Sequence, residues 1–342
     1  MKITIRDVAN AANVSPATVS RVINTPELVG EETKVKVQET IDKLGFSPNA
    51  IARGLSVQKT NTIGLIVPGI SDFFFNELYV GIEEVARKNN MKVLLFDSQH
   101  SEYRVQEGLT FLKQHQVDGI IFTSRPITSD YDAILSRLDV PVVLALTQSY
   151  GTYPLKSFRV DDYKAAYDAV SYLISRGHQR IGMISGPTTD IIAGKTRLTG
   201  YKAALQQSSI PISDEAIEYG EFRFEDGYRA MARLLEKQST NKLTAVFAAS
   251  DEMAIGAMRC LHDKGIRVPD DISVMGFDDL RICQMSTPTL TTVAQPLKQI
   301  GEFAVSHLLK CMEDESTSID NSIHYVSHHI VERESVRIIV PD

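Results

Sequence analysis

Hydroxyl and carboxylate side chains follow two apolar segments in the second half of this chain. Ser250 and Asp251 come directly after the apolar segment 245–249, and Asp278 comes two residues after the segment 272–276. The carboxyl ends of parallel strands share one edge of a sheet, where small ligands commonly bind. A carboxylate such as that of Asp278 can accept two hydroxyl hydrogen bonds, which is a common way to hold a saccharide. Ser250 is then the expected direct ligand contact, while Asp251 is expected to cap the following helix and to help fix the shape of the cleft.

Three phenylalanines and one arginine could complete such a site. The run 73–75 is Phe-Phe-Phe, and an aromatic ring can stack on the apolar face of a sugar or a base. Arg197 lies near the start of a predicted helix, where the dipole disfavours a cation, and its planar guanidinium suits two oxygen acceptors. Simpler uses stay open: adjacent aromatics commonly belong to a core, the pair Asp161 and Asp162 can serve as a helix cap, and Arg197 can be a surface residue.

Alternating strands and helices must position these residues. The first series predicts strands at 62–67, 92–96, 119–122 and 140–144, with helices at 76–89, 102–115 and 131–138. The second series predicts helices at 162–176, 196–207, 224–235 and 251–264, with strands at 180–185, 218–220, 245–248 and 272–276. Continuous apolar strands are typical of parallel sheets that are buried on both faces. Two such series therefore predict an α/β core of two lobes.

The N-terminal residues 4–24 have a different pattern, which predicts two short helices with a tight turn. Thr4 and Asp7 have the spacing of a capping box at the first helix, and Ser15 followed by Pro16 is a typical start of the second. The residues on or near the outer face of the second helix are Pro16, Ala17, Thr18, Ser20 and Arg21. A helix-turn-helix protein lays such a helix in the DNA major groove, although any small helical hairpin would share the pattern.

Two further segments follow this helix pair. Residues 31–44 predict a third helix, which ends at Gly45 and would brace the first two. Pro48 then stops the chain from continuing as helix, and Asn49 can cap a new one. Residues 50–57 alone are too short to form a stable helix in water, so the sequence alone indicates a linker.

Composition and missing motifs exclude several classes of protein. The net charge is −7, but residues 1–60 hold eight Lys and Arg against six Asp and Glu, so the acidic excess lies in the core. An acidic core limits non-specific DNA binding. Three cysteines without a CxxC pair suggest no disulfide framework and no metal site, which fits a reducing cytoplasm. The sequence lacks a signal peptide, a membrane-length apolar run, a G-x-G-x-x-G fingerprint, a P-loop and a G-x-S-x-G elbow. We therefore expect neither an enzyme nor a cofactor. A sugar-binding protein of the transport type could have the same two-lobe core, but it would carry a signal peptide and no N-terminal helix pair of this kind.

The stretch 4–24 reads TIRDVANAANVSPATVSRVIN and resembles the opening helices of the lactose/galactose repressor (LacI/GalR) family. The resemblance covers nearly the whole chain and implies an all-α helix-turn-helix domain followed by a two-lobe, periplasmic-binding-protein-like core. It implies a helix-turn-helix domain at 1–46, a hinge at 47–60, an N-terminal lobe at 61–161 with 290–319, and a C-terminal lobe at 162–289 with 320–342. The DNA-binding residues it implies are Thr4, Ser15, Pro16, Ala17, Thr18, Ser20, Arg21 and Asn24, with Asn49, Ala52, Arg53 and Leu55 in the hinge.

In that family the hinge helix orders on DNA, and Leu55 would be its wedge into the minor groove. The resemblance also selects the effector-binding residues Phe74, Phe75, Asp162, Arg197, Ser250 and Asp278. A saccharide is the favoured effector, while a purine or a sugar phosphate stays open. The loop 187–193 is uncommon in the family, so it leaves the identity of the effector undecided.

The same resemblance implies the partners of the protein. They are double-stranded operator DNA, a small-molecule effector and a second copy of the chain, since two half-sites need two reading helices. The helix at 295–312 resembles the segment with which one Gram-positive member of the family binds a phosphocarrier protein. This chain has Lys298 and Ser306 where that member has Tyr and Arg, so no such partner is expected. Neither a membrane nor a coiled-coil tetramer is indicated, and repression is favoured over activation.

Overall fold

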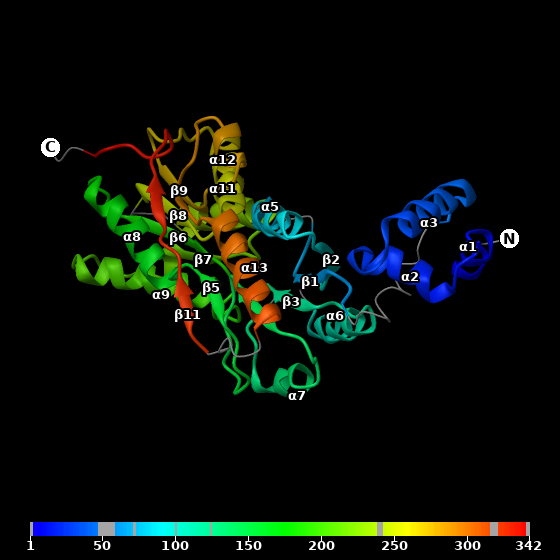
Figure 1. Ribbon diagram of the computed structural model, residues 1–342. Helices are drawn as coiled ribbons and strands as arrows, with labels where there is room; N and C mark the ends of the chain where they lie inside the picture. The colour runs from blue at the N-terminus through cyan, green and yellow to red at the C-terminus, as the bar shows by residue number, and fades with distance from the viewer. Residues whose placement is uncertain are drawn as a thin grey trace.

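The computed structural model describes residues 3–46, 59–70, 73–99, 101–123, 125–237, 242–314 and 321–339. Figure 1 shows a small N-terminal unit of helices and a larger α/β body. The hinge positions Asn49, Ala52, Arg53 and Leu55 lie outside the described residues. Among the described residues, no helix is long and apolar enough to cross a bilayer.

The N-terminal unit has the predicted helix-turn-helix arrangement. Its helices are α1 (Ile5–Ala11), α2 (Pro16–Asn24), the short 3-10 helix η1 (Pro26–Leu28) and α3 (Glu31–Leu44). The Asp7 carboxylate accepts hydrogen bonds from the Thr4 N–H at 2.8 Å and the Thr4 hydroxyl at 2.7 Å. Ser15 caps α2 by accepting the Thr18 N–H at 3.1 Å. The core of this unit consists of Val8, Ala9, Ala12, Val19, Val22, Val37 and Ile41, so α3 braces the two shorter helices as predicted.

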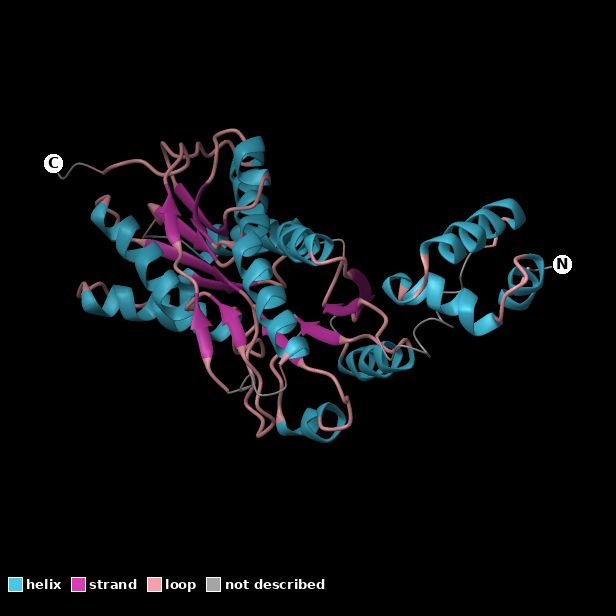
Figure 2. Ribbon diagram, in the orientation of Figure 1, coloured by secondary structure: helices cyan, strands magenta, loops and turns pink. Residues whose placement is uncertain are grey.

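The N-terminal lobe is a parallel sheet with helices on both faces (Figure 2). Its strands, in spatial order, are β11 (Ile323–Tyr325), β5 (Ser157–Arg159), β4 (Val142–Ala145), β3 (Gly119–Phe122), β1 (Thr62–Val67) and β2 (Lys92–Asp97). Its helices are α5 (Phe73–Lys88), α6 (Glu102–Gln114), α7 (Asp132–Leu135) and α13 (Leu297–Glu313). Successive residues of β1 point to opposite faces: Leu65 packs with Ile82 of α5, and Ile66 packs with Leu109 of α6.

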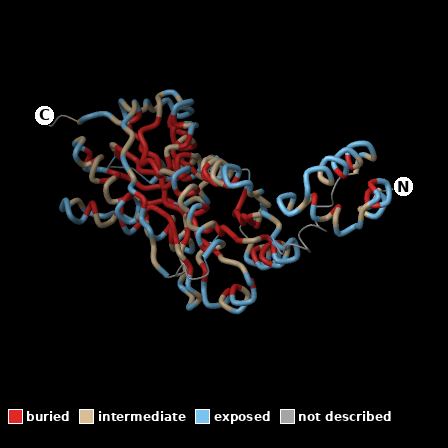
Figure 3. The backbone as a smooth tube through the Cα atoms, in the orientation of Figure 1, coloured by how far each residue is buried: buried red, intermediate tan, exposed pale blue. Residues whose placement is uncertain are grey.

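The C-terminal lobe repeats this architecture. Its strands, in spatial order, are β12 (His329–Val331), β10 (Thr291–Ala294), β9 (Ser273–Asp278), β8 (Ala245–Ala248), β6 (Ile181–Ser185) and β7 (Ile217–Tyr219). Its helices are α8 (Asp162–Ser175), α9 (Gly194–Gln207), α10 (Phe224–Lys237), α11 (Asp251–Asp263) and α12 (Ile282–Met285). All strand pairs are parallel except β10 with β12. Buried residues follow the strands of both sheets (Figure 3).

The chain crosses between the lobes three times, and two of the crossings lie later than expected. Strand β10 pairs with β9, so residues 291–294 belong to the C-terminal lobe and not to the N-terminal lobe. Strand β11 pairs with β5, so residues 323–325 belong to the N-terminal lobe. The predicted boundaries at 290 and 320 are therefore wrong. A strand of three or four residues joins the sheet in which it finds hydrogen-bond partners, and its own sequence does not show which sheet that is.

In both lobes, pairs of helices pack so closely that a glycine of one helix lies against the backbone of the other. A Cβ at Gly81 of α5 would overlap the backbone of Lys298 in α13, and a Cβ at Gly200 of α9 would overlap the Tyr163 carbonyl in α8. In the α10·α11 pair, a Cβ at Gly256 would overlap the Phe224 carbonyl. Each helix pair is therefore held at a separation that only glycine permits at these points.

Replacing Gly256 with alanine is expected to lower the free energy of unfolding by about 1–3 kcal/mol, because the extra methyl group must push α10 and α11 apart. The intrinsic helix propensity of alanine favours the variant by only about 1 kcal/mol. Urea-induced unfolding measures the difference. Glu236→Ala is the control, because Glu236 lies exposed on α10. A Gly256→Ala protein as stable as the wild type would contradict close packing at this crossing.

Candidate functional site

A cavity of about 550 Å³ lies between the two lobes. Its wall contains residues from the N-terminal lobe, such as Thr123 and Thr147, and residues from the C-terminal lobe, such as Phe222. All six side chains predicted to contact a ligand line it, namely Phe74, Phe75, Asp162, Arg197, Ser250 and Asp278. Strand ends and helix starts of both lobes thus bring together residues that are far apart in the sequence.

Two aromatic rings form part of the N-terminal wall. Helix α5 begins at Phe73, three residues earlier than predicted, so Phe74 and Phe75 lie in its first turn. Their rings meet edge to face with centroids 5.0 Å apart. Phe73 is 60% exposed and does not line the cavity. Of the three phenylalanines in this run, only Phe74 and Phe75 therefore line the cavity.

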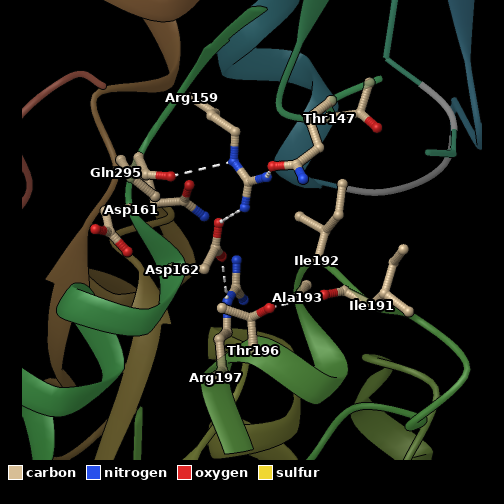
Figure 4. Close-up of polar contacts among 12 residues, drawn as sticks. Thr147, Arg159, Asp161, Asp162, Ile191, Ile192, Ala193, Thr196, Arg197 and Gln295 are labelled. Atoms are coloured by element: carbon tan, nitrogen blue, oxygen red, sulfur yellow. Dashed lines mark hydrogen bonds and ion pairs between the residues drawn. The ribbon is translucent and has the colours of Figure 1, made fainter. Parts of the chain in front are cut away.

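Asp162 lies between two buried arginines, as Figure 4 shows. Its Oδ2 accepts a hydrogen bond from Arg159 Nη2 at 2.6 Å, and its Oδ1 accepts one from Arg197 Nε at 2.8 Å. The neighbouring Asp161 instead caps α8 by accepting the Lys164 N–H at 3.0 Å. The two adjacent carboxylates therefore have different tasks, and only Asp162 lines the cavity.

Further contacts fix the Arg197 side chain. Its Nη1 donates to the Ala249 carbonyl at 2.6 Å, and its guanidinium carbon lies 3.7 Å from the centroid of the Phe277 ring. Stacking on an aromatic face adds a cation–π interaction to these hydrogen bonds. Two of the Arg197 nitrogens therefore bond to protein oxygens, instead of the whole fork pointing at a ligand as the resemblance implied.

Asp278 is buried at the end of β9, with 5% of its surface exposed. Its Oδ1 accepts a hydrogen bond from Gln295 Nε2 at 2.7 Å and lies 3.8 Å from Arg197 Nη1. Burial holds the pKa of Asp278 well above its usual range, although the charge of Arg197 acts in the opposite direction. Desolvation of the charged form is the cause. Such a carboxyl group can accept hydrogen bonds from a ligand when it is ionised and can also donate one when it is protonated.

At the start of α11, Ser250 and not Asp251 is the helix cap. The Ser250 hydroxyl oxygen accepts the Met253 N–H at 3.2 Å and also donates to the Phe222 carbonyl at 3.1 Å. Asp251 is fully buried and accepts hydrogen bonds from the Leu280 N–H at 2.7 Å and the Thr292 hydroxyl at 2.5 Å. The prediction that Asp251 caps the helix was wrong, because its side chain turns inward and ties three segments of the C-terminal lobe together. Ser250 still lines the cavity.

Two bulky residues in the cavity wall, Leu146 and Phe222, have positive φ angles of +60° and +66°. Asp278 also has a positive φ angle, of +126°. Side chains other than glycine, asparagine and aspartate rarely adopt positive φ, and such strain concentrates at binding sites. The strained positions give independent support to a functional role for this cavity.

Sequence reasoning missed several residues of the cavity wall. They are Thr147, Arg159, Phe222 and Gln295, together with Asp190, Ile192 and Ala193 of the unusual loop. The loop is ordered by Asp190, whose Oδ1 accepts the N–H groups of Ile192 and Ala193, both at 2.9 Å. Arg159 could have been noticed in the sequence, because it is a charged residue in the short strand-like segment Ser-Phe-Arg-Val. The others carried no sequence signal, because only the fold brings them together.

The predicted DNA-reading face lies on the outer side of α2. Pro16, Ala17 and Arg21 are exposed, and Ser15 precedes them at the exposed cap. Thr18, Ser20 and Asn24 are half-buried, and Ser20 accepts a hydrogen bond from Asn24 Nδ2 at 3.2 Å. Of the residues named here, Arg21 is the one whose side chain is long and positively charged, and it is exposed on this face of α2.

Comparison with known proteins agrees with this architecture. A family model described as bacterial regulatory proteins, lacI family, matches residues 4–49, and one described as periplasmic binding proteins and sugar binding domain of LacI family matches residues 60–330. Catabolite control protein A of Priestia megaterium is 40% identical over 337 residues, which cover 98% of this chain and 100% of the relative.

Two solved structures extend the comparison to the fold. The lac repressor dimer bound to operator and the anti-inducer ONPF has a TM-score of 0.86 at 26% identity, covering 98% of this chain and 100% of that one. The complex of the transcriptional regulator CelR with cellobiose has a TM-score of 0.72 at 29% identity, covering 97% of this chain and 99% of that one. This chain therefore belongs to the LacI family and is a DNA-binding transcriptional regulator with an effector-binding domain, not an enzyme.

Proposed function

We propose that this regulator is a repressor whose affinity for a palindromic operator is set by a sugar or sugar derivative bound between its lobes. Phe74 and Phe75 stack on the apolar face of the ligand, as aromatic residues commonly do with sugars. Ser250 and Asp278 form hydrogen bonds with its hydroxyl groups, and the Asp162–Arg197 ion pair forms the polar wall of the cavity. The cellobiose in the CelR complex is a sugar bound by a structural relative.

One observation carries this proposal. Six side chains, spread from position 74 to position 278, line one cavity of about 550 Å³ that contains residues of both lobes. A ligand that touches both lobes binds one relative orientation of the lobes better than another, and this difference in affinity is what shifts a conformational equilibrium. The cavity thus has the location that an allosteric effector site requires.

Two copies of the chain bind the operator, because one reading helix contacts one half-site. The lac repressor relative is a dimer on its operator. In our proposal Arg21 reads a base edge, in particular that of guanine, while Pro16 and Ala17 pack on thymine methyl groups. Leu55 is the proposed minor-groove wedge. The three buried, free cysteines suit the reducing cytoplasm that we propose as its location.

A ligand screen tests the proposal. Thermal shift of the full-length protein is measured with sugars, sugar phosphates and nucleobases, and each ligand that raises the Tm is then added to an operator-binding titration. A ligand that binds the folded and not the unfolded protein raises the Tm, by an amount that grows with the logarithm of its concentration above the Kd. We expect at least one sugar or sugar derivative to change operator affinity. Ligands that stabilise the protein but leave operator affinity unchanged would contradict the allosteric role.

The variant Asp278→Ala is expected to bind the effector about tenfold to a hundredfold more weakly, because it loses hydrogen bonds made in a buried site. Its operator affinity without ligand should match that of the wild type, since Asp278 lies in the core and not in the reading helices. Calorimetric titration and operator binding measure the two effects. Asp270→Ala is the matched control, as Asp270 is 61% exposed on the surface of the C-terminal lobe. Unchanged effector affinity in Asp278→Ala would remove this residue from the site.

A further inference from the structure

The turn at residues 278–280 brings Asp278 and Leu280 to the wall of the cavity. The φ angle is +126° at Asp278 and +61° at Asp279. Aspartate tolerates the left-handed region near +60°, but +126° lies well outside that region and strongly favours glycine. The surrounding structure must therefore hold the backbone of Asp278 in a conformation that this residue does not adopt by itself.

The buried side chain of Asp251 holds the end of this turn. Its Oδ2 accepts the Leu280 N–H at 2.7 Å, and its Oδ1 accepts the Thr292 hydroxyl at 2.5 Å. A Cβ at Gly276 would lie 2.3 Å from the same Oδ1, so the glycine leaves the room that the carboxylate needs. The chain is thus anchored two residues beyond Asp278.

Other contacts hold the start and the middle of the turn. Gln295 Nε2 donates to Asp278 Oδ1 at 2.7 Å, and Arg333 Nη2 donates to Asp279 Oδ1 at 2.6 Å. The Gln295 N–H also donates to the Asp278 carbonyl at 3.2 Å. The backbone of Asp278 is therefore fixed between the Gln295 N–H on one side and the Asp251 carboxylate on the other, and both anchors remain when the side chain at 278 is changed.

The carboxylate of Asp251 is costly to bury. It is fully buried, and burial raises its pKa above the usual range, because desolvation penalises the charged form. Both donors described above are uncharged, so neither neutralises it. An apolar side chain in this place would avoid the cost. Asp251 does not itself line the cavity, although its neighbours Ser250 and Glu252 do, so any role in the site is exerted through another residue.

From these contacts we infer that Asp251 is a positioning residue of the effector site, which holds the Leu280 N–H and thereby keeps Asp278 at positive φ with its carboxyl group at the cavity. This inference rests on the proposed function, because it explains how one residue of the same site is held. A carboxylate that only stabilised the C-terminal lobe would make the same hydrogen bonds without setting the conformation at 278. The two roles therefore differ in how position 278 responds when Asp251 is removed.

Thermal melting of Asp278→Gly and Asp278→Ala tests the inference without a ligand. Both variants lose the same carboxyl group, so the difference between their Tm values reports the backbone at this position. While the turn is held at positive φ, the glycine variant should melt about 2–6 °C above the alanine variant, because only alanine is strained there. In an Asp251→Ala background the turn can relax and the order should reverse, because glycine loses more backbone entropy on folding. The same order in both backgrounds would overturn the inference.

Three further backgrounds separate positioning from general support of the lobe. Thr292→Val removes the other partner of the same carboxylate with almost no change of shape, and it should keep the glycine variant above the alanine variant. Asp251→Asn should keep this order as well, since its amide oxygen can accept the Leu280 N–H while its amide nitrogen donates to Thr292. Asp251→Ser is too short to reach Leu280, so it should reverse the order, and it covers the case in which Asp251→Ala fails to fold. A reversal caused by Thr292→Val would show that any loosening of the lobe releases the turn, and would overturn the inference.

Calorimetric titration then connects the turn to ligand binding, with the sugar that raises the Tm most in the ligand screen as the probe. Asp251→Ser should weaken this sugar by about tenfold or more, as expected when a hydrogen bond in a buried site is lost. In an Asp278→Ala background the same substitution should cause no further loss, because Asp251 acts only through that carboxyl group. A further loss of similar size would mean that Asp251 supports another part of the site, which contradicts the inference.

The inference and the proposed function fail in different ways. If the order of the glycine and alanine variants does not depend on Asp251, only the inference is wrong. If the order reverses as expected but no sugar changes operator affinity, the proposed function is wrong, and with it the part of the inference that concerns the effector.

Discussion

Replacing Asp162 with alanine is expected to lower the free energy of unfolding by about 3–5 kcal/mol, the typical cost of removing one partner from a buried ion pair. The variant would leave Arg159 and Arg197 buried without a counter-charge, since both donate to Asp162. Chemical denaturation followed by circular dichroism measures the loss. The same variant should lose effector binding, because the two guanidinium groups would repel each other and turn away.

The adjacent Asp161 provides the control for this prediction. Asp161→Ala removes only the cap of α8, which typically costs about 1 kcal/mol. The two variants delete the same carboxylate one residue apart, so the difference between them isolates the buried pair. Equal destabilisation by the two would show that Asp162, like its neighbour, acts mainly as a helix-terminal residue. Asp162→Asn should fall between them, because it keeps a hydrogen-bond acceptor and loses the charge.

Arg21→Ala is expected to produce the largest change in DNA binding. A bidentate contact to a guanine is worth about 1–3 kcal/mol per half-site. In a dimer on a palindrome the variant loses this contact twice, so operator affinity should fall by about 2–6 kcal/mol, or roughly thirtyfold to more than ten-thousandfold. Fluorescence anisotropy with operator and unrelated DNA measures both affinities. Affinity for unrelated DNA should change far less.

The lysine variant distinguishes base recognition from simple charge at position 21. Arg21→Lys keeps the charge and should keep the salt dependence of binding, but it loses the planar fork that suits guanine. We expect the preference at one symmetric pair of operator positions to weaken. If Arg21→Ala weakens every operator variant by the same factor, Arg21 contacts phosphate and does not read a base.

The fold was predictable wherever local pattern decides it. Helix α3 begins at Glu31 and ends at Leu44, as predicted from its acidic start and from Gly45, whose φ of +62° is the left-handed conformation of a helix end. Strands β3 and β8 also have the predicted limits, because both are short apolar runs with all four residues buried. Local signals suffice for elements of this kind.

Several predictions about the fold were wrong because the structure depends on contacts between residues that are far apart in the sequence. The early start of α5 at Phe73 extends the helix through three aromatic residues that the sequence placed in a loop. The lobe crossings depend on which sheet β10 and β11 join, and the inward turn of Asp251 depends on Thr292, 41 residues away. None of these choices is encoded in a window of a few residues.

Only some of the residues that line the cavity were predictable from the sequence. Family resemblance and strand ends located the six selected side chains, because ligands in parallel α/β folds bind at the carboxyl ends of the strands. The partners of those side chains were not predictable. Arg159 looked like one charged residue in a short strand, and only the three-dimensional structure shows that it donates to the same carboxylate as Arg197.

The glycine crossings in the helix pairs have a mechanical consequence. Helices in backbone contact have little room to slide past one another, so we expect each lobe to move as a unit and the easiest motion to be a rotation of one lobe against the other about the three chain crossings. Along the chain, the reading helices are followed by β1 of the N-terminal lobe. A ligand that contacts both lobes is therefore expected to change operator affinity by turning one lobe against the other. The amplitude of that rotation, and not any local loosening near the cavity, should set the strength of the response.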